Sequence, residues 1–208
     1  MKLKPIFLFC VISVWTFNAM AQSTFALQNG NAQVNAPVFD ALSNRLSGTN
    51  YAAELWGGSS SNSLSPALEL DSHQRVIVPF LTGGAAGYFS SAKSITVFQA
   101  FAGDFAWVQV RAWDARLGST YEQVAELGMG GYGESLLLYI EGGNPTYVPP
   151  TSPRSLIGLQ SFSLRPVPEP SIWQLSLLGA PILFWFGHRR TSRSLYLFLK
   201  PFTKPSTS

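Results

Sequence analysis

Residues 105–113 read Phe-Ala-Trp-Val-Gln-Val-Arg-Ala-Trp, and this alternating stretch decides the fold class. Successive side chains of a β-strand point to opposite faces of a sheet, so Phe105 and Trp107 share one face and the two valines share the other. Both faces are partly apolar, which is typical of a central strand in a β-sandwich. Residues 94–98, Ser-Ile-Thr-Val-Phe, alternate in the same way.

Outward from this stretch, short apolar segments separated by glycines predict an all-β domain. Further candidate strands lie at residues 24–28, 33–39, 53–56, 67–70, 75–80, 136–140 and 157–164. Short strands at this spacing favour a β-sandwich with a jelly-roll-like connection. One short helix is predicted at residues 120–126, with Ser119 as its N-cap and Glu122 completing a capping box.

The 208-residue chain has a formal net charge of +3, but its excess positive charge lies at the two ends. Residues 23–165 hold seven basic and ten acidic side chains, a net charge of −3. Such a domain lacks the clustered Lys and Arg that neutralise phosphates, so we predict no nucleic-acid partner. A single cysteine excludes a disulfide framework and multi-cysteine metal sites.

The first 21 residues have the composition of a secretory signal peptide, which implies export by the secretion machinery. Two lysines precede a largely apolar stretch at residues 6–17, and Ala19 and Ala21 give the small-x-small pattern that signal peptidase cleaves. Twelve helical residues reach only about 18 Å, too short for a hydrocarbon core of about 30 Å. An uncleaved N-terminal anchor is the alternative.

Residues 171–187 form a second apolar stretch, which carries no charge and is just long enough for a transmembrane helix. Basic residues follow and indicate a cytoplasmic stop-transfer segment: Arg189, Arg190 and Arg193. The predicted order is a signal peptide (1–21), an exported β-sandwich domain (22–165), a segment with the membrane helix (166–190) and a basic cytoplasmic tail (191–208). A buried core helix is the alternative for residues 171–187.

Directly before the apolar stretch stand Val167, Pro168, Glu169 and Pro170. Pro-Glu-Pro, a short apolar helix and two arginines, in this order, resemble the C-terminal sorting signal of PEP-CTERM proteins. The resemblance covers residues 166–190. It implies processing by an exosortase-like membrane enzyme and delivery to the cell surface or the exopolysaccharide matrix of a Gram-negative bacterium. This chain continues for 18 residues beyond Arg190, whereas the family usually stops just after its arginines.

Catalytic machinery is hard to assemble from the predicted domain. His73 is its one histidine and lies in a polar turn, and the chain has no Gly-x-Ser-x-Gly motif. One histidine without cysteine predicts no zinc site, and no calcium-loop motif occurs. Residues 128–133 match Gly-x-Gly-x-x-Gly, but they follow the predicted helix instead of opening one, so we interpret these glycines as turn residues. We predict a non-enzymatic protein without metal or cofactor.

Two alternatives remain open. Glu122 and Glu134 are the candidate acids of a glycoside hydrolase, although ten acids on a small domain will always offer some such pair. The other alternative is a carbohydrate-binding module, because an exposed aromatic ring can stack on a sugar face. Its expected contacts with polysaccharide are an exposed Trp56 with Tyr51 and Tyr132, whereas the tryptophans of residues 105–113 are expected to pack in the core.

Overall fold

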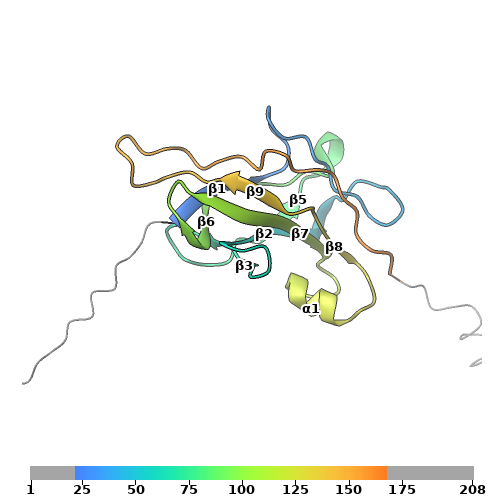
Figure 1. Ribbon diagram of the computed structural model, residues 1–208. Helices are drawn as coiled ribbons and strands as arrows, with labels where there is room; N and C mark the ends of the chain where they lie inside the picture. Colours follow the sequence, from blue (N-terminus) through green and yellow to red (C-terminus); the bar gives the residue numbers. More distant parts are fainter. Residues whose placement is uncertain (1–21, 168–208) are drawn as a thin grey trace, which may run out of the picture. The chain divides into compact units, whose positions relative to one another are not determined.

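The computed structural model of the chain describes residues 22–167, which form an all-β fold with one short α-helix (Figure 1). The signal peptide, residues 168–170 of the sorting motif, the membrane helix and the basic tail, as predicted above, lie outside the described residues; Val167 is described and exposed. Within residues 22–167, no helix has the length and apolar character needed to cross a membrane.

Two antiparallel sheets make up the fold. The smaller has the order β1-β6-β4, formed by Gln22–Gln28, Ser90–Phe101 and Leu68–Glu69. The larger has the order β3-β2-β7-β8, formed by Ser65–Pro66, Gly48–Gly58, Phe105–Asp114 and Tyr132–Glu134. β5 (Val78–Phe80) pairs with β2, and β9 (Leu138–Glu141) pairs with β7. A 3-10 turn, η1 (Gly83–Ala85), and helix α1 (Tyr121–Glu126) complete the elements.

A shared apolar core lies between the sheets. Phe25 of β1 and Val97 of β6 pack with Leu55 of β2 and with the valines of β7, and all of them are buried. The sheets approach closely where Gly57 faces Val97, since a Cβ built on Gly57 would lie 2.6 Å from Val97 Cγ2. Glycine is therefore required at this position to let the two layers close.

The central pair of the larger sheet is β2 with β7. Their register runs without a break from Tyr51 opposite Asp114 to Gly58 opposite Trp107. The alternation of residues 105–113 correctly predicts the long strand β7, with its valines in the core. The strand predictions at 24–28, 53–56 and 94–98 are also confirmed, and these strands extend further than the patterns indicated.

The predictions of strands at residues 33–39 and 157–164 are wrong, because both segments form irregular chain with only isolated bridges. The first does alternate in burial, but Pro37 has no N–H to donate to a ladder. Instead, the buried Asn29 side chain holds it, donating to the carbonyl oxygens of Ala36 and Gly87 and accepting from the Phe89 N–H. The apolar alternation of this segment therefore predicts its buried side chains correctly, but the hydrogen-bonded strand that it also predicts does not form.

Strand β8 and the helix cap also differ from expectation. β8 has only three residues and contains Gly133, so its sequence carries no strand pattern. The predicted cap at Ser119 is wrong: Thr120 is the N-cap, and its side chain accepts from the Gln123 N–H. The Gln123 side chain in turn accepts from the Ser119 N–H, which satisfies one more amide before the helix.

We predict that Gly57→Ala destabilises the domain by roughly 1–3 kcal/mol, the usual cost of forcing an extra methyl group into a packed core. The new Cβ would meet both Val97 methyl groups and the Trp107 carbonyl oxygen. Urea denaturation followed by tryptophan fluorescence measures the loss. The control is Gly84→Ala in η1, where a Cβ would meet nothing within 4 Å. Equal stability of the two variants would contradict the close approach of the sheets.

Candidate functional site

The outer face of the larger sheet, turned away from the core, carries the candidate site. Five side chains of β7 lie on it, alternating with the core residues of the same strand: Phe105, Trp107, Gln109, Arg111 and Trp113. Helix α1 covers one end of this row, where Trp113 is fully buried against Tyr121. Toward the other end the row becomes accessible, and Phe105 is 53% exposed. Figure 1 shows α1 beside β7 and β8, with β9 along the opposite part of β7.

Three aromatic rings stack at the open end of this row. Tyr139 of β9 is the register partner of Trp107, and their ring centroids are 4.9 Å apart. Phe105 stacks on the same tyrosine at 5.1 Å, with an angle of 27° between the ring planes. Tyr139 is 55% exposed and Trp107 is partly exposed. We call these three residues the aromatic platform.

On the other flank of Trp107, β2 contributes no side chain. Its register partner on β2 is Gly58, and a Cβ at this position would collide with the Ser63 carbonyl oxygen. The serine-rich loop that follows β2, residues 59–64, therefore folds back over Gly58 and lies beside the platform. Glycine is needed here for the close approach of two backbone segments.

A polar pocket of about 300 Å³ lies further along β7. Its lining comes from the serine-rich loop, β7, β8 and the connection to β9: Ser61, Asn62, Leu64, Gln109, Arg111, Glu134 and Leu137. Gln109 donates to the Ser135 carbonyl oxygen at 3.0 Å and accepts from Arg111 Nε at 3.0 Å, so the floor of the pocket is fixed. Glu134 accepts from the Tyr121 hydroxyl at 3.2 Å, and its side chain is 38% exposed.

Between this pocket and α1 lies a partly buried charge cluster, formed by Glu54, Arg75 and Glu122. The Glu54 side chain is 2% exposed; it accepts from Arg75 at 2.7 Å and from the Trp56 indole N–H at 2.6 Å. Arg75 also donates to Glu122 on α1 at 3.0 Å, which ties the helix to the sheet. Arg111 covers the Trp56 ring, with its Cζ atom 3.8 Å from the ring centroid.

The pKa values of the cluster follow from burial and from the shared cation. Burial raises the pKa of Glu54, even though hydrogen bonds from Arg75 and Trp56 favour its charged form. Partial burial also opposes ionisation of Glu122, but hydrogen bonds from Arg75 outweigh it and lower the pKa of that group. Burial, together with the nearby Glu134 carboxylate, raises the pKa of Tyr121 to about 12. Tyr121 is therefore a neutral hydrogen-bond donor to Glu134.

The structure corrects the expectation for Trp56, which is buried and 8% exposed. Its ring lies under Arg111 and next to Tyr121, so it offers no face to a sugar. Tyr51 packs against the core from the opposite face of β2, and Tyr132 is partly buried against Tyr121. The three residues predicted to contact carbohydrate thus do not form one open surface.

The expected burial of Trp113 is confirmed. The same expectation is wrong for Trp107, which is partly exposed and belongs to the aromatic platform. Sequence reasoning missed this platform, although two signals pointed to it. Alternation placed Phe105 and Trp107 on one face, and the predicted strand at 136–140 contained Tyr139. Only the pairing of β7 with β9 brings these signals together.

The other residues considered for catalysis lie apart from the platform. His73 is exposed in a turn with φ of 53°, as predicted. Gly128, Gly130 and Gly131 adopt positive φ between α1 and β8, which confirms their interpretation as turn residues. The candidate acids Glu122 and Glu134 are engaged with Arg75 and with Tyr121 respectively. Among residues 22–167, no three His, Cys, Asp or Glu side chains are grouped so that they could hold a metal ion.

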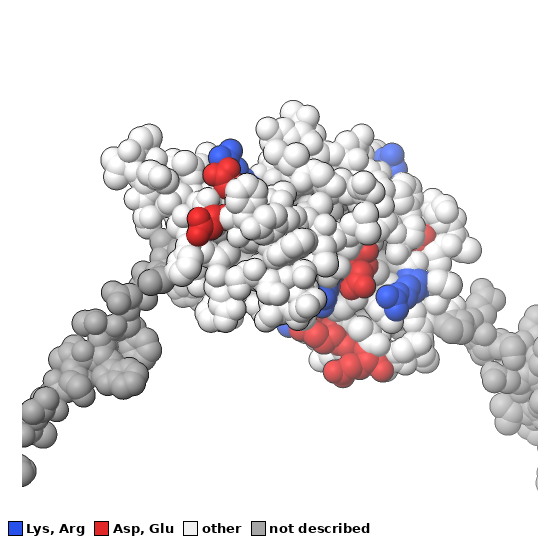
Figure 2. Space-filling model, in the orientation of Figure 1, with Lys and Arg blue, Asp and Glu red and all other residues white. Residues whose placement is uncertain are grey.

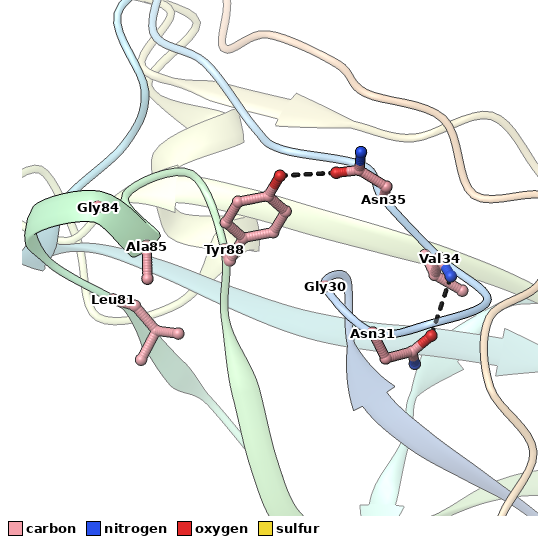
Figure 3. A pocket seen from close by; sticks show the side chains of 8 residues that line it. All are labelled: Gly30, Asn31, Val34, Asn35, Leu81, Gly84, Ala85 and Tyr88. Atoms are coloured by element: carbon pink, nitrogen blue, oxygen red, sulfur yellow. Dashed lines mark hydrogen bonds between the residues drawn. The ribbon is translucent and has the colours of Figure 1, made fainter.

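A second pocket, of about 430 Å³, lies near η1 (Figure 3). It is lined by Gly30, Asn31, Val34, Asn35, Leu81, Gly84, Ala85 and Tyr88. Figure 3 shows its polar groups bonded within the domain: the Tyr88 hydroxyl donates to Asn35 at 2.6 Å, and Asn31 accepts from the Val34 N–H at 2.9 Å. The Gly30 backbone also lies against the Tyr88 ring. Two of the polar groups that line this pocket are therefore already bonded to neighbours in the domain.

Comparison of the chain with protein-family models, curated proteins and solved structures finds no match.

We predict that Arg75→Met destabilises the domain by about 3 kcal/mol, because it leaves the buried Glu54 carboxylate without its cation. Adding Glu54→Gln removes the charge, so the double variant should recover part of the loss. Chemical denaturation at neutral pH measures both. Lys93→Met is the control, since it breaks an exposed pair with Glu69 and should cost far less. A double variant no more stable than Arg75→Met would contradict the role assigned to Arg75.

Proposed function

We propose that this chain is an exported, C-terminally anchored protein of the cell surface or the exopolysaccharide matrix, and that its non-enzymatic β-domain binds polysaccharide. Binding uses the aromatic platform and the adjoining polar pocket. The exposed stack of Phe105, Trp107 and Tyr139 is the observation that carries this proposal.

Polysaccharide fits this surface for two reasons. The C–H faces of a sugar ring pack on aromatic rings, which supply a large contact area at low cost in side-chain entropy. The hydroxyl groups of the next sugar need fixed hydrogen-bonding partners, and the polar pocket offers the Glu134 carboxylate and the side chains of Ser61 and Asn62. The serine-rich loop borders both the platform and the pocket, so one ligand can contact them together.

The sequence supports the location. The signal peptide, the Pro-Glu-Pro motif, the apolar stretch and the arginines occur in the order that the PEP-CTERM resemblance implies. In this proposal the domain crosses the membrane through the secretion machinery, the helix at residues 171–187 holds it, and an exosortase-like enzyme processes the segment near Pro170. The same proposal includes that the strands of the domain are connected in a jelly-roll-like order.

The platform is tested by removing single rings. Tyr139→Ala and Trp107→Ala should each weaken binding of the full chain to exopolysaccharide from its own cells by at least about tenfold, equivalent to about 1.4 kcal/mol. Affinity electrophoresis measures the change. The matched control is Phe98→Ala on the outer face of the smaller sheet, because Phe98 is 55% exposed, as Tyr139 is. Undiminished binding by both platform variants would refute the proposed site.

Sorting is tested by mass spectrometry of the protein recovered from cells and from medium. We expect a mature chain that starts at Gln22 and ends near Pro170, because the predicted cleavage sites lie there. A chain that still carries Arg189 and the residues after it would instead indicate an ordinary membrane anchor. The substitution Pro168→Ala with Pro170→Ala should then change the recovered C-terminus only if the motif is read by a processing enzyme.

A further inference from the structure

We infer that the polysaccharide bound by the platform and the pocket is neutral, a polymer of hexose units without uronate, sulfate or phosphate groups. This inference rests on the proposed function and specifies its ligand. It comes from the charges of the domain, which are few and mutually compensated. Figure 2 shows the face in view as mostly uncharged, with Lys and Arg scattered among Asp and Glu.

Most Lys and Arg side chains of the domain lie close to a carboxylate of the same domain. Seven Lys and Arg side chains lie in residues 22–167, and six of them have a carboxylate oxygen within 4.0 Å: Arg75, Lys93, Arg111, Arg116, Arg154 and Arg165. The seventh, Arg45, lies over the Tyr88 ring. The same residues carry ten acids, so the domain is net negative. An acidic polymer would be repelled overall, and Arg45, the one cation of residues 22–167 without a carboxylate partner, does not line the pocket.

The charged side chains around the site also favour a neutral ligand. Arg111 is the one cation that lines the pocket, and its side chain is only 18% exposed because Trp56, Gln109 and Glu134 surround it. At the platform, Glu141 is the register partner of Phe105, and Asp104 precedes it in the chain. A uronate carboxylate would therefore meet a protein carboxylate on each part of the site, Glu134 in the pocket and Glu141 beside Phe105. The cations next to these two acids, Arg165 and Arg154, already lie 3.8 Å from them.

Neutral sugars have the groups that this surface can use. Their hydroxyl groups donate to the Glu134 carboxylate and exchange hydrogen bonds with Asn62, while their apolar faces cover the platform rings. Trp107 and Gln109 are two residues apart on one face of β7, about 7 Å at the usual rise of a strand. The stacking and hydrogen-bonding parts are thus adjacent. The outer face from Phe105 to Arg111 spans about 20 Å, which calls for an oligosaccharide of several units.

The experiment is affinity electrophoresis of the full chain in detergent, through gels that contain either a neutral polymer or an acidic one. The neutral probes are hydroxyethylcellulose, mixed-linkage β-glucan and galactomannan; the acidic probes are alginate and polygalacturonate. We expect retardation by at least one neutral polymer, with less than about a twofold change in affinity on raising the salt, because no ion pair forms. The acidic polymers should not retard the chain.

Each result has a separate meaning. Stronger retardation by an acidic polymer, abolished by Tyr139→Ala, would overturn the neutral-ligand inference and leave the proposed function standing. No retardation by any probe, or retardation that survives both Tyr139→Ala and Trp107→Ala, would overturn the proposed site and the inference with it. Glu134→Gln gives a further check: it should weaken neutral binding several-fold by removing a charged acceptor, and unchanged neutral binding would contradict the inference. Glu126→Gln, an exposed acid on α1, is the control.

Discussion

The pairing of β2 with β7 is the constraint on which the rest of the structure depends. Side chains alternate strictly along both strands, so a slip of one residue would exchange the core face and the outer face. The observed register puts Leu55 and the valines of β7 inside and sets Gly58 beside Trp107 outside. The close contact of Gly57 with Val97 adds a steric limit, since a side chain at this position would collide with the smaller sheet. Core and candidate site are therefore fixed together.

The buried carboxylate of Glu54 explains why only half of the outer face is open. A charged group on a sheet face must be either solvated or paired, and Glu54 is paired with Arg75 and the Trp56 indole. Arg75 reaches both this carboxylate and Glu122, so helix α1, which is too short to be stable alone, is held over the sheet. The helix then shields Trp56 and Trp113 from solvent. Phe105, Trp107 and Tyr139 lie beyond its reach and stay accessible.

The sequence was sufficient for strands whose own pattern carries the information. Alternation identified β7 and β6, and the position of the glycines after the predicted helix indicated turn residues, which their positive φ values confirm. It failed where tertiary contacts decide: Asn29 ties the segment around Pro37 to Gly87 and Phe89, which lie 58 and 60 residues after Asn29. Trp56 shows the same limit for the site. Its glycine and serine neighbours suggested exposure, but burial depends on Arg111, which is 55 residues away in sequence and adjacent in the sheet.

An exposed aromatic platform has a cost in water, so its persistence beside a well-packed core calls for a partner. A protein partner would need an interface of roughly 800 Å² on each side, with an apolar centre and a polar rim. Here the three rings form a narrow strip that passes directly into a pocket of hydroxyl, amide and carboxylate groups. Stacking rings and hydrogen-bonding groups follow one another along one strand instead of being arranged as centre and rim. A polymer with apolar faces and hydroxyl edges matches this order better than a folded protein surface does, which is why the geometry favours polysaccharide.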